Sequence, residues 1–243
     1  MKDLWKSVIL GLSIIISVWV LSMALTYRSR NSHTIQATGL GEIEFTSDQI
    51  VWSGSFSVQA NNRIDAYNAI ERDKELVKKY LDDNGVKADE IIWSFANVEA
   101  NFRSLYNSEG NYVGSTFSHY SASQSFTITS ADIDKIEEIS RSISSLAKQN
   151  VNISSESPSY YYTHLSEIKQ KLIELASADA KCRCKAIADN AGSGLGKLQS
   201  ANLGVFQITD PTGSDDYSYG GAFNTWSRDK KASITVRVVF QLK

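Results

Sequence analysis

An uncharged apolar run near the start of the chain constrains the fold more than any other feature. The run, SVILGLSIIISVWVLSMALTY, extends from Ser7 to Tyr27 and contains Ile14 and Trp19. It has about the twenty residues that an α-helix needs to cross a bilayer, and basic residues flank it on both sides. A buried core helix is rarely apolar on every face. We therefore expect this run to be a membrane-targeting segment.

Two interpretations of this segment remain open. The small residues from Ser22 to Ala24 fit a signal-peptidase site, whereas the apolar run is longer than a usual signal-peptide core and continues through Leu25. We favour an uncleaved anchor formed by residues 1–30, which would place residues 31–243 on the periplasmic side of the inner membrane. Cleavage would instead release residues 31–243 as a soluble periplasmic protein. Both interpretations export the body of the protein.

Residues 31–243 alternate between strand-like and helix-like segments. Apolar and polar residues alternate in the former, whereas apolar residues recur at helical spacing in the latter. We predict helices at residues 63–83, 131–149 and 165–190, and strands at residues 35–45, 50–58, 90–106, 112–130, 151–153, 160–162, 198–208 and 233–242. Hairpins mixed with helices in this order favour an α+β domain, with an antiparallel or mixed sheet packed against about three helices, over a doubly wound parallel sheet.

Composition and motif spacing exclude several classes of function. The net charge is −2 and both signs are interspersed, so the chain lacks the basic face that nucleic-acid binding requires. The histidines lie in separate segments and form neither a Ser/His/Asp arrangement nor a zinc-ligand pattern. Asp210, Asp215 and Asp216 share a loop but lack the spacing of an EF-hand. We expect no catalytic residues, no metal, no cofactor and no nucleic-acid partner, and a protein that is not an enzyme.

The segment ADAKCRCKAIADNAGSGLGKL, residues 178–198, contains glycines that invite comparison with phosphate-binding loops. The intervals between these glycines match neither a P-loop nor a dinucleotide fingerprint, and the glycines follow a helix rather than a strand. Asn190, Ala191 and Gly192 instead fit the end of a helix, with glycine in the left-handed cap position. The alanines before them would let the helix lie close against a sheet.

The same segment holds both cysteines of the chain, Cys182 and Cys184. Their side chains diverge on a helix, so a disulfide between them would break it, and C-x-C is not the spacing of a structural zinc site. We expect Cys182 to be buried on an apolar stripe with Leu172, Leu175 and Ala178, and Cys184 to be exposed among basic residues. A structural role for the pair is favoured. The alternative is that Cys184 is a reactive thiol in an oxidising compartment.

A long loop before the last predicted strand, residues 209–230, is rich in glycine, aspartate and aromatic residues. It exceeds the usual length of a connection and contains Tyr217, Tyr219, Phe223 and Trp226. Aromatic residues on an exposed loop often mark a contact surface. The alternative interpretation is that these side chains fold back onto the body.

Several segments share their order and spacing with those of a known family. They are TIQATGLGEIEFTSDQIVWSGSFSV at residues 34–58, a helix that ends in NGV before KADEI, and residues 178–198. The matching positions of the third helix and of the turn after it are Ala176, Ala180, Lys185, Ala186, Ile187, Ala188, Gly192 and Gly196. With these features residues 34–243 resemble the bacterial SIMPL-domain proteins. Ser47 and Asp48 stand where that family usually has Pro-Asp, and the cysteines are not part of its pattern.

The resemblance implies an exported α+β protein of the cell envelope. Some relatives form ring-like or channel-like oligomers and are linked to stress tolerance, and the family supplies no set of catalytic residues. Our first hypothesis is a non-enzymatic envelope protein, tethered by its N-terminal helix, that self-assembles or binds another envelope protein. The alternative is a periplasmic protein that binds a small ligand, or protects against oxidation, through Cys184 or a pocket near residues 209–230.

Overall fold

The N-terminal segment is only partly described by the computed structural model, which describes residues 11–23, 33–213 and 218–243. Ile14 and Trp19 lie in a helix at residues 11–23. Ser7 and Tyr27, the ends of the predicted anchor, lie outside the described residues. Among the described residues no helix is long and apolar enough to cross a membrane, so the predicted transmembrane helix is not found there.

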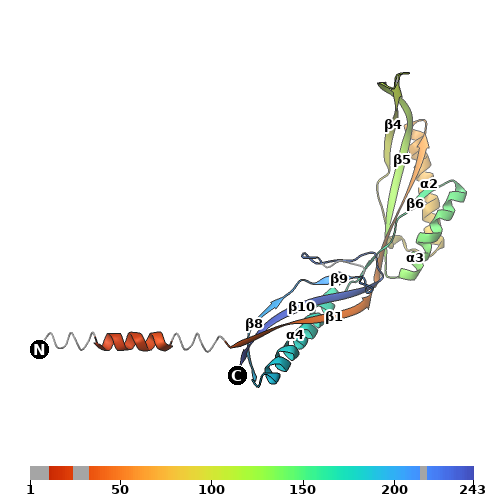
Figure 1. Ribbon diagram of the computed structural model, residues 1–243. Coiled ribbons are helices and arrows are strands. Elements are labelled where there is room, and N and C mark those ends of the chain that lie inside the picture. Colours follow the sequence, from red (N-terminus) through yellow and green to blue (C-terminus); the bar gives the residue numbers. More distant parts are fainter. Residues whose placement is uncertain (1–10, 24–32, 214–217) are drawn as a thin grey trace.

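The body consists of two lobes, each built from a sheet with helices on one face (Figure 1). The terminal lobe contains both ends of the body, and the inserted lobe contains the residues between its first strand and its long helix. The named strands pair antiparallel in both sheets. The α+β prediction is therefore confirmed, and the strands form two sheets rather than one.

The terminal lobe joins strands from opposite ends of the body. Its elements are β1 (Thr34–Thr46), α4 (Leu165–Asn190), β8 (Leu195–Leu203), β9 (Gln207–Thr209) and β10 (Asp229–Leu242). β1 and β10 pair along their length, β8 lies on the other side of β10, and β9 pairs with the start of β10. α4 covers one face of this sheet (Figure 1).

α4 lies close to β1 because the residues that face each other are small. Its buried positions are spaced four apart, at Ile168, Leu172, Ala176, Ala180, Cys184 and Ala188. A Cβ atom at Gly39 would overlap backbone atoms of Ala176 and Ala180, and a Cβ atom at Gly41 would overlap the carbonyl oxygen of Leu172. Glycine in β1 and alanine in α4 therefore permit a helix-to-strand approach that larger side chains would prevent.

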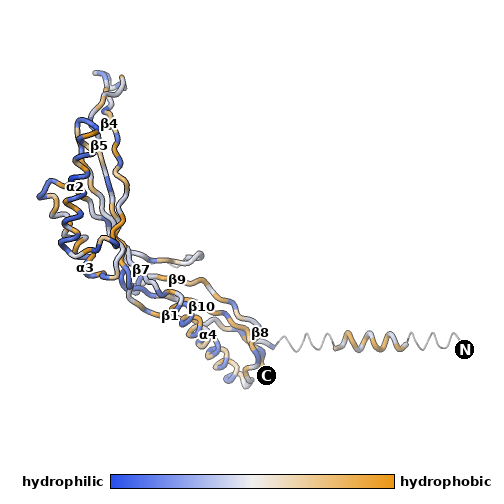
Figure 2. The backbone as a smooth tube through the Cα atoms, turned by 180° about the vertical axis from the view of Figure 1, so that it is seen from behind, coloured by the Kyte–Doolittle hydropathy of each residue, from blue (hydrophilic) through white to orange (hydrophobic). Residues whose placement is uncertain are grey.

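The inserted lobe contains the second sheet. Its elements are β2 (Gln49–Ala60), α2 (Arg63–Asp83), η1 (Ala88–Glu90), β3 (Ile91–Trp93), β4 (Asn97–Tyr106), β5 (Tyr112–Ser130), α3 (Ile133–Ser142), η2 (Ile143–Gln149), β6 (Asn152–Ser155) and β7 (Ser159–Tyr161). The strand order is β3-β5-β2-β6, while β4 also pairs with β5 and β7 with β2. α2 and α3 pack on one face, and α2 contains many hydrophilic residues (Figure 2).

Alternate residues of β2 and β5 build the core of the inserted lobe. Trp52, Phe56 and Phe126 are fully buried, and the Trp52 and Phe126 rings meet edge to face with their centroids 5.3 Å apart. α2 contributes Ile70 and Val77 to the same cluster. Burying each such side chain stabilises the fold by roughly 1.5–3 kcal/mol. The remaining alternate residues of both strands face away from the helices.

The hairpin formed by β4 and β5 projects past the helices of the inserted lobe (Figure 1). Its distal half carries exposed aromatic side chains that contact one another across the two strands. The ring centroids of Phe102 and Phe117 are 6.1 Å apart, and those of Tyr106 and Tyr112 are 6.0 Å apart. These cross-strand pairs stabilise a ribbon that no third strand supports.

Asp48 fixes the junction between the two lobes. Its backbone N–H donates to the Tyr161 carbonyl oxygen at 3.0 Å, and the N–H of Ser47 donates to the Arg228 carbonyl oxygen at 2.9 Å. Its carboxylate accepts hydrogen bonds from the Thr163 backbone N–H at 2.8 Å and the Thr163 hydroxyl at 2.7 Å, just before α4 begins. His164 Nδ1 lies 3.2 Å from the same carboxylate. The Asp48 side chain thus holds the segment that follows β1 against the segment that precedes α4.

Candidate interaction site at the loop after β9

Buried polar residues fix the base of the loop that joins β9 to β10. The Gln207 side chain donates from Nε2 to the Ser218 carbonyl oxygen at 2.7 Å and accepts the Ala222 N–H at 2.5 Å. The backbone of Ile208 bonds the loop twice more, donating to the Ala222 carbonyl oxygen at 2.8 Å and accepting from the Asn224 N–H at 3.0 Å. The two ends of the loop are thereby held side by side.

A buried ammonium group completes this base. Lys230 is only 2 % exposed, and its Nζ donates to the Asn224 carbonyl oxygen at 2.6 Å and the Ser227 carbonyl oxygen at 2.7 Å. The Asn224 side chain accepts the Ser227 N–H at 2.9 Å. Because a buried charge requires such partners, these bonds specify one path for the chain between residues 224 and 230. We call Gln207, Asn224 and Lys230 the loop base.

The aromatic side chains of the loop point away from the core. Tyr219 is fully exposed, Trp226 is 64 % exposed and Phe223 is 53 % exposed, with its ring centroid 6.5 Å from that of Tyr161. Tyr217 lies outside the described residues. The interpretation in which these side chains fold back onto the body is wrong for Tyr219 and Trp226, whereas Phe223 contacts Tyr161 and is about half exposed. We call Tyr219, Phe223 and Trp226 the aromatic loop; its role as an interaction surface stays a prediction.

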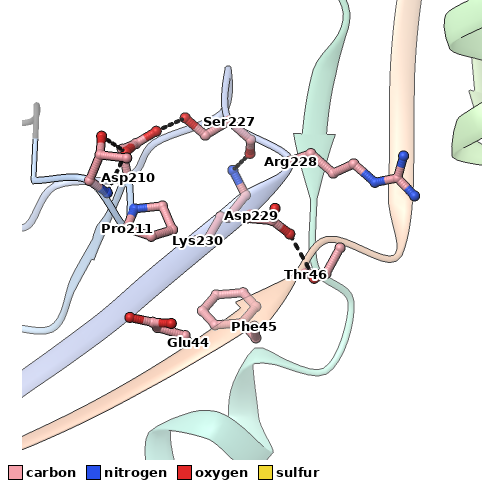
Figure 3. A pocket seen from close by; sticks show the side chains of 10 residues that line it. Glu44, Phe45, Thr46, Asp210, Pro211, Ser227, Arg228, Asp229 and Lys230 are labelled. Atoms are coloured by element: carbon pink, nitrogen blue, oxygen red, sulfur yellow. Dashed lines mark hydrogen bonds between the residues drawn. The ribbon is translucent and has the colours of Figure 1, made fainter.

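A polar pocket of about 590 Å³ lies between the loop and β1 (Figure 3). Asp210 accepts hydrogen bonds inside it from the Ser227 hydroxyl at 2.6 Å, the Thr212 hydroxyl and the Thr212 N–H, and these bonds lower the pKa of Asp210. The Arg228 side chain points away from Asp210 (Figure 3). We call this cavity the β1–loop pocket; its lining residues are Glu44, Phe45, Thr46, Asp210, Pro211, Thr212, Ser227, Arg228, Asp229 and Lys230.

Arg228 connects the loop to the inserted lobe instead. Its guanidinium lies 2.5 Å from an Asp134 carboxylate oxygen and 3.9 Å from Glu137 Oε1. The hydrogen bond with Asp134 raises the pKa of Arg228 and lowers the pKa of Asp134. Glu137 also accepts the Tyr160 hydroxyl at 2.9 Å, and burial together with this bond raises the pKa of Tyr160 to about 12. These groups link the two lobes.

A second pocket, of about 500 Å³, lies on the other side of the loop. Tyr219 and Gln207 line it together with Leu40 of β1, Val205 and Thr235 of β10. This pocket is more apolar than the β1–loop pocket. Tyr219 of the aromatic loop thus contributes to the surface of this second pocket, whereas none of the three aromatic residues lines the β1–loop pocket.

The predicted exposures of the two cysteines are wrong. Cys184 is buried on the face of α4 that packs on the sheet, and Cys182 is exposed. The packed face consists of small residues spaced four apart, whereas the prediction followed the larger Leu175, which is exposed. Burial raises the pKa of the Cys184 thiol, so less of it is present as the reactive thiolate. Cys184 is therefore not the accessible thiol that a redox site requires.

The glycine segment after α4 ends the helix as expected. α4 ends at Asn190, and Gly192 has φ of 70°, the left-handed conformation that glycine adopts at low cost. Gly194 then pairs with Lys243 through two backbone hydrogen bonds. Within the described residues no group of three or more His, Cys, Asp or Glu side chains is placed to hold a metal ion.

The fold and the site together describe a two-lobed α+β protein with an exposed loop of aromatic residues. The sequence matches the SIMPL family, described as a protein of unknown function (DUF541), over residues 35–240. The chain therefore belongs to the SIMPL family. No curated protein matches the sequence. The family description assigns no chemistry, so the function has to be argued from the chain itself.

Proposed function

We propose that this chain is a non-enzymatic protein of the cell envelope that self-assembles, or binds another envelope protein, through its aromatic loop. The observation that carries the proposal is the combination of a fixed loop base with exposed rings at Tyr219, Phe223 and Trp226. A loop that is held in place loses less conformational entropy on binding. Tyrosine and tryptophan are also enriched at the centres of protein interfaces.

The proposal includes an N-terminal membrane tether. The uncharged apolar run around Ile14 and Trp19, with basic residues on both sides, supports a single-pass anchor in the inner membrane with both lobes in the periplasm. A soluble periplasmic protein, released by cleavage, is the alternative. Membership of the SIMPL family is compatible with both, and we extend the proposal to a role in envelope or stress tolerance on the resemblance alone.

Light scattering behind size exclusion on residues 31–243, with and without reductant, tests the proposal. The proposal predicts a discrete oligomer of the same mass in both conditions. A monomer in both conditions at high concentration would remove self-assembly. An oligomer that dissociates in reductant would instead assign the contact to a disulfide through the exposed Cys182.

A second candidate function is binding of a small polar ligand in the β1–loop pocket. Its volume of about 590 Å³ and its position beside the loop support this alternative. A thermal-shift screen of small polar compounds on wild type and on Glu44→Trp, which would fill the pocket, separates the two functions. A compound that stabilises only the wild type supports ligand binding. Oligomerisation without any such compound supports assembly.

A further inference from the structure

The inserted lobe has a second face that none of the helices described by the structure covers (Figure 1). Trp52, Phe56 and Phe126 point toward the helices, so the residues between them on β2 and β5 point the opposite way. These outward residues are almost all hydroxyl-bearing, and they are paired across the two strands. We call them the hydroxyl face; its residues are Ser53, Ser55, Ser57, Ser121, Ser123, Ser125 and Thr127.

The cross-strand pairs of this face place hydroxyl groups next to one another in register. Ser55 is opposite Ser125 and Ser57 is opposite Ser123, while the Ser53 and Thr127 hydroxyls are hydrogen-bonded at 2.9 Å. Each hydroxyl both donates and accepts hydrogen bonds. The face therefore presents uncharged hydrogen-bond donors and acceptors in a regular array, and these groups are not part of the hydrophobic core.

A pocket of about 400 Å³ opens at the edge of the hydroxyl face, where β3 ends and β4 begins along β5. The connection between these strands is held in place because the Ser94 N–H donates to the Ser125 carbonyl oxygen and the Ser125 N–H donates to the Ser94 hydroxyl, both at 2.9 Å. The next residue, Phe95, lines the pocket and is 83 % exposed. A large apolar ring thus lies exposed to solvent beside a cavity whose other residues are serines and amides.

Gln124 is the cross-strand partner of Phe56 and therefore lies on the helix side of β5, behind the pocket. This residue is only 4 % exposed, and its Nε2 donates to the Ser94 carbonyl oxygen at 2.7 Å, which further holds the connection between β3 and β4 in place. Its Oε1 is buried and accepts no hydrogen bond within the described part of the chain.

The lining defines the chemistry of the ligand. It includes serine hydroxyls, the Asn97 amide and the Phe95 ring, and none of its residues has an ionisable side chain. Glu99, farther along β4, accepts a hydrogen bond from Asn97 Nδ2 at 2.7 Å and so orients that amide. A phosphate or carboxylate would find no cation among these groups, and an amine would find no anion. An uncharged molecule rich in hydroxyl groups satisfies them.

We propose that this pocket and the adjoining hydroxyl face bind an uncharged saccharide chain. Sugar hydroxyls would hydrogen-bond with the serines and the Asn97 amide, and the apolar C–H face of a pyranose ring would stack on Phe95. The serine rows of β2 and β5 would continue the contact along neighbouring sugar units. This site lies in the inserted lobe, away from the aromatic loop, and it does not depend on assembly.

Saturation-transfer NMR of the full-length chain with cellotetraose and with chitotetraose tests this site. The chain is kept in a detergent that is not a glycoside, because a maltoside head group would itself compete. Transfer to either oligosaccharide is expected at millimolar concentration. Phe95→Ala should weaken binding about tenfold, and Ser123→Glu, which places a carboxylate at the pocket, should abolish it. Near-ultraviolet circular dichroism checks that both variants remain folded.

Phe102→Ala provides the matched control. Phe102 is another exposed aromatic residue of the same sheet, but its ring contacts Phe117 on the hairpin and does not line the pocket. This variant should bind as the wild type does. Transfer to neither oligosaccharide would overturn the proposal, and so would equal binding by folded Phe95→Ala, Ser123→Glu and wild type.

Discussion

Lys230 enters the loop base from β10, in phase with Ala232, Ile234 and Val236 of the buried face. A lysine at such a position in a strand indicates a buried cation, and the pattern is readable in the segment DKKASITVRV. The sequence does not indicate which groups accept hydrogen bonds from that cation. Asn224 belongs to an irregular loop, and no periodicity connects it to the strand.

Replacing Lys230 with methionine should destabilise the protein by roughly 1–3 kcal/mol, because the Asn224 and Ser227 carbonyl oxygens would be left buried without their donor. The neighbouring Lys231→Met is the control. Lys231 lies 2.9 Å from a Glu42 carboxylate oxygen in a partly exposed pair, and its loss should cost less than about 1 kcal/mol. Urea denaturation measures both, and equal effects of the two substitutions would argue against the loop base.

The two cysteines should differ sharply in reactivity in the native protein. A thiol reagent should modify Cys182 and spare Cys184, since Cys184 is buried and its pKa is raised. The Cys182→Ser variant should therefore react only after unfolding, whereas Cys184→Ser should react at once. Rapid modification of native Cys182→Ser would show that Cys184 is accessible.

Asp48 should give the protein a component of acid sensitivity. Burial alone would raise the pKa of this carboxyl, but hydrogen bonds from the Thr163 hydroxyl and N–H and from His164 outweigh it, so the pKa lies below the ordinary 3.8. A lowered pKa stabilises the fold above the unfolded value, and this stabilisation is lost as pH falls through the folded value. The group is partly exposed, so we expect about 1 kcal/mol.

Asp48→Asn tests this component by thermal unfolding across pH. At neutral pH the wild type should be more stable than Asp48→Asn, and the difference should shrink as the pH falls below 3.8, where the wild-type carboxyl becomes neutral. A difference in Tm that stays constant from neutral to acid pH would mean that the charge of Asp48 does not hold the junction.

At the scale of elements, the contact of α4 with β1 is the most specific packing in the terminal lobe. Gly39→Ala should destabilise the protein by roughly 1–3 kcal/mol, because the added methyl group meets the backbone of α4 at Ala176 and Ala180. Gly220→Ala is the matched control, since no protein atom lies closer than 4.0 Å to a Cβ there. Denaturation midpoints compare the two, and equal stability would contradict the close approach.

Local patterns predicted most elements of this fold. The helix predicted at residues 165–190 is α4. The strand predicted at residues 112–130 is β5, whereas the strand predicted at residues 90–106 is divided into β3 and β4. The helix predicted at residues 131–149 begins as α3 and continues from Ile143 as a 3₁₀ helix. The strand predicted at residues 198–208 is divided into β8 and β9. Boundaries of this kind depend on tertiary hydrogen bonds that periodicity does not encode.

The division into two sheets was not predictable in the same way. β1 and β2 are separated by only two residues, which resembles a hairpin in sequence, yet β1 pairs with β10 and β2 pairs with β5. Pairing between the two ends of the body is non-local, and one sequence carries no signal for it. The candidate site was also predictable only in part. The length and composition of residues 209–230 indicated the aromatic loop, but the loop base depends on tertiary contacts that the local sequence does not encode.

At the scale of the whole molecule, the two surfaces available to partners belong to different lobes. The aromatic loop is part of the terminal lobe, which also contains Thr34, where the N-terminal segment joins the body (Figure 1). The hydroxyl face and the projecting hairpin belong to the inserted lobe. Arg228 and Asp48 connect the lobes. This arrangement would let the terminal lobe assemble beside a membrane while the inserted lobe contacts another component.

Sedimentation velocity on residues 31–243 tests assembly through the aromatic loop most directly. The double variant Tyr219→Ser, Trp226→Ser removes two exposed rings and leaves the loop base intact, and Phe102→Ser removes an exposed ring from the other lobe. Wild type and Phe102→Ser should sediment as the same oligomer in the presence of reductant, and the double variant as a monomer. An unchanged oligomer in the double variant, or a monomeric wild type, would contradict the proposal.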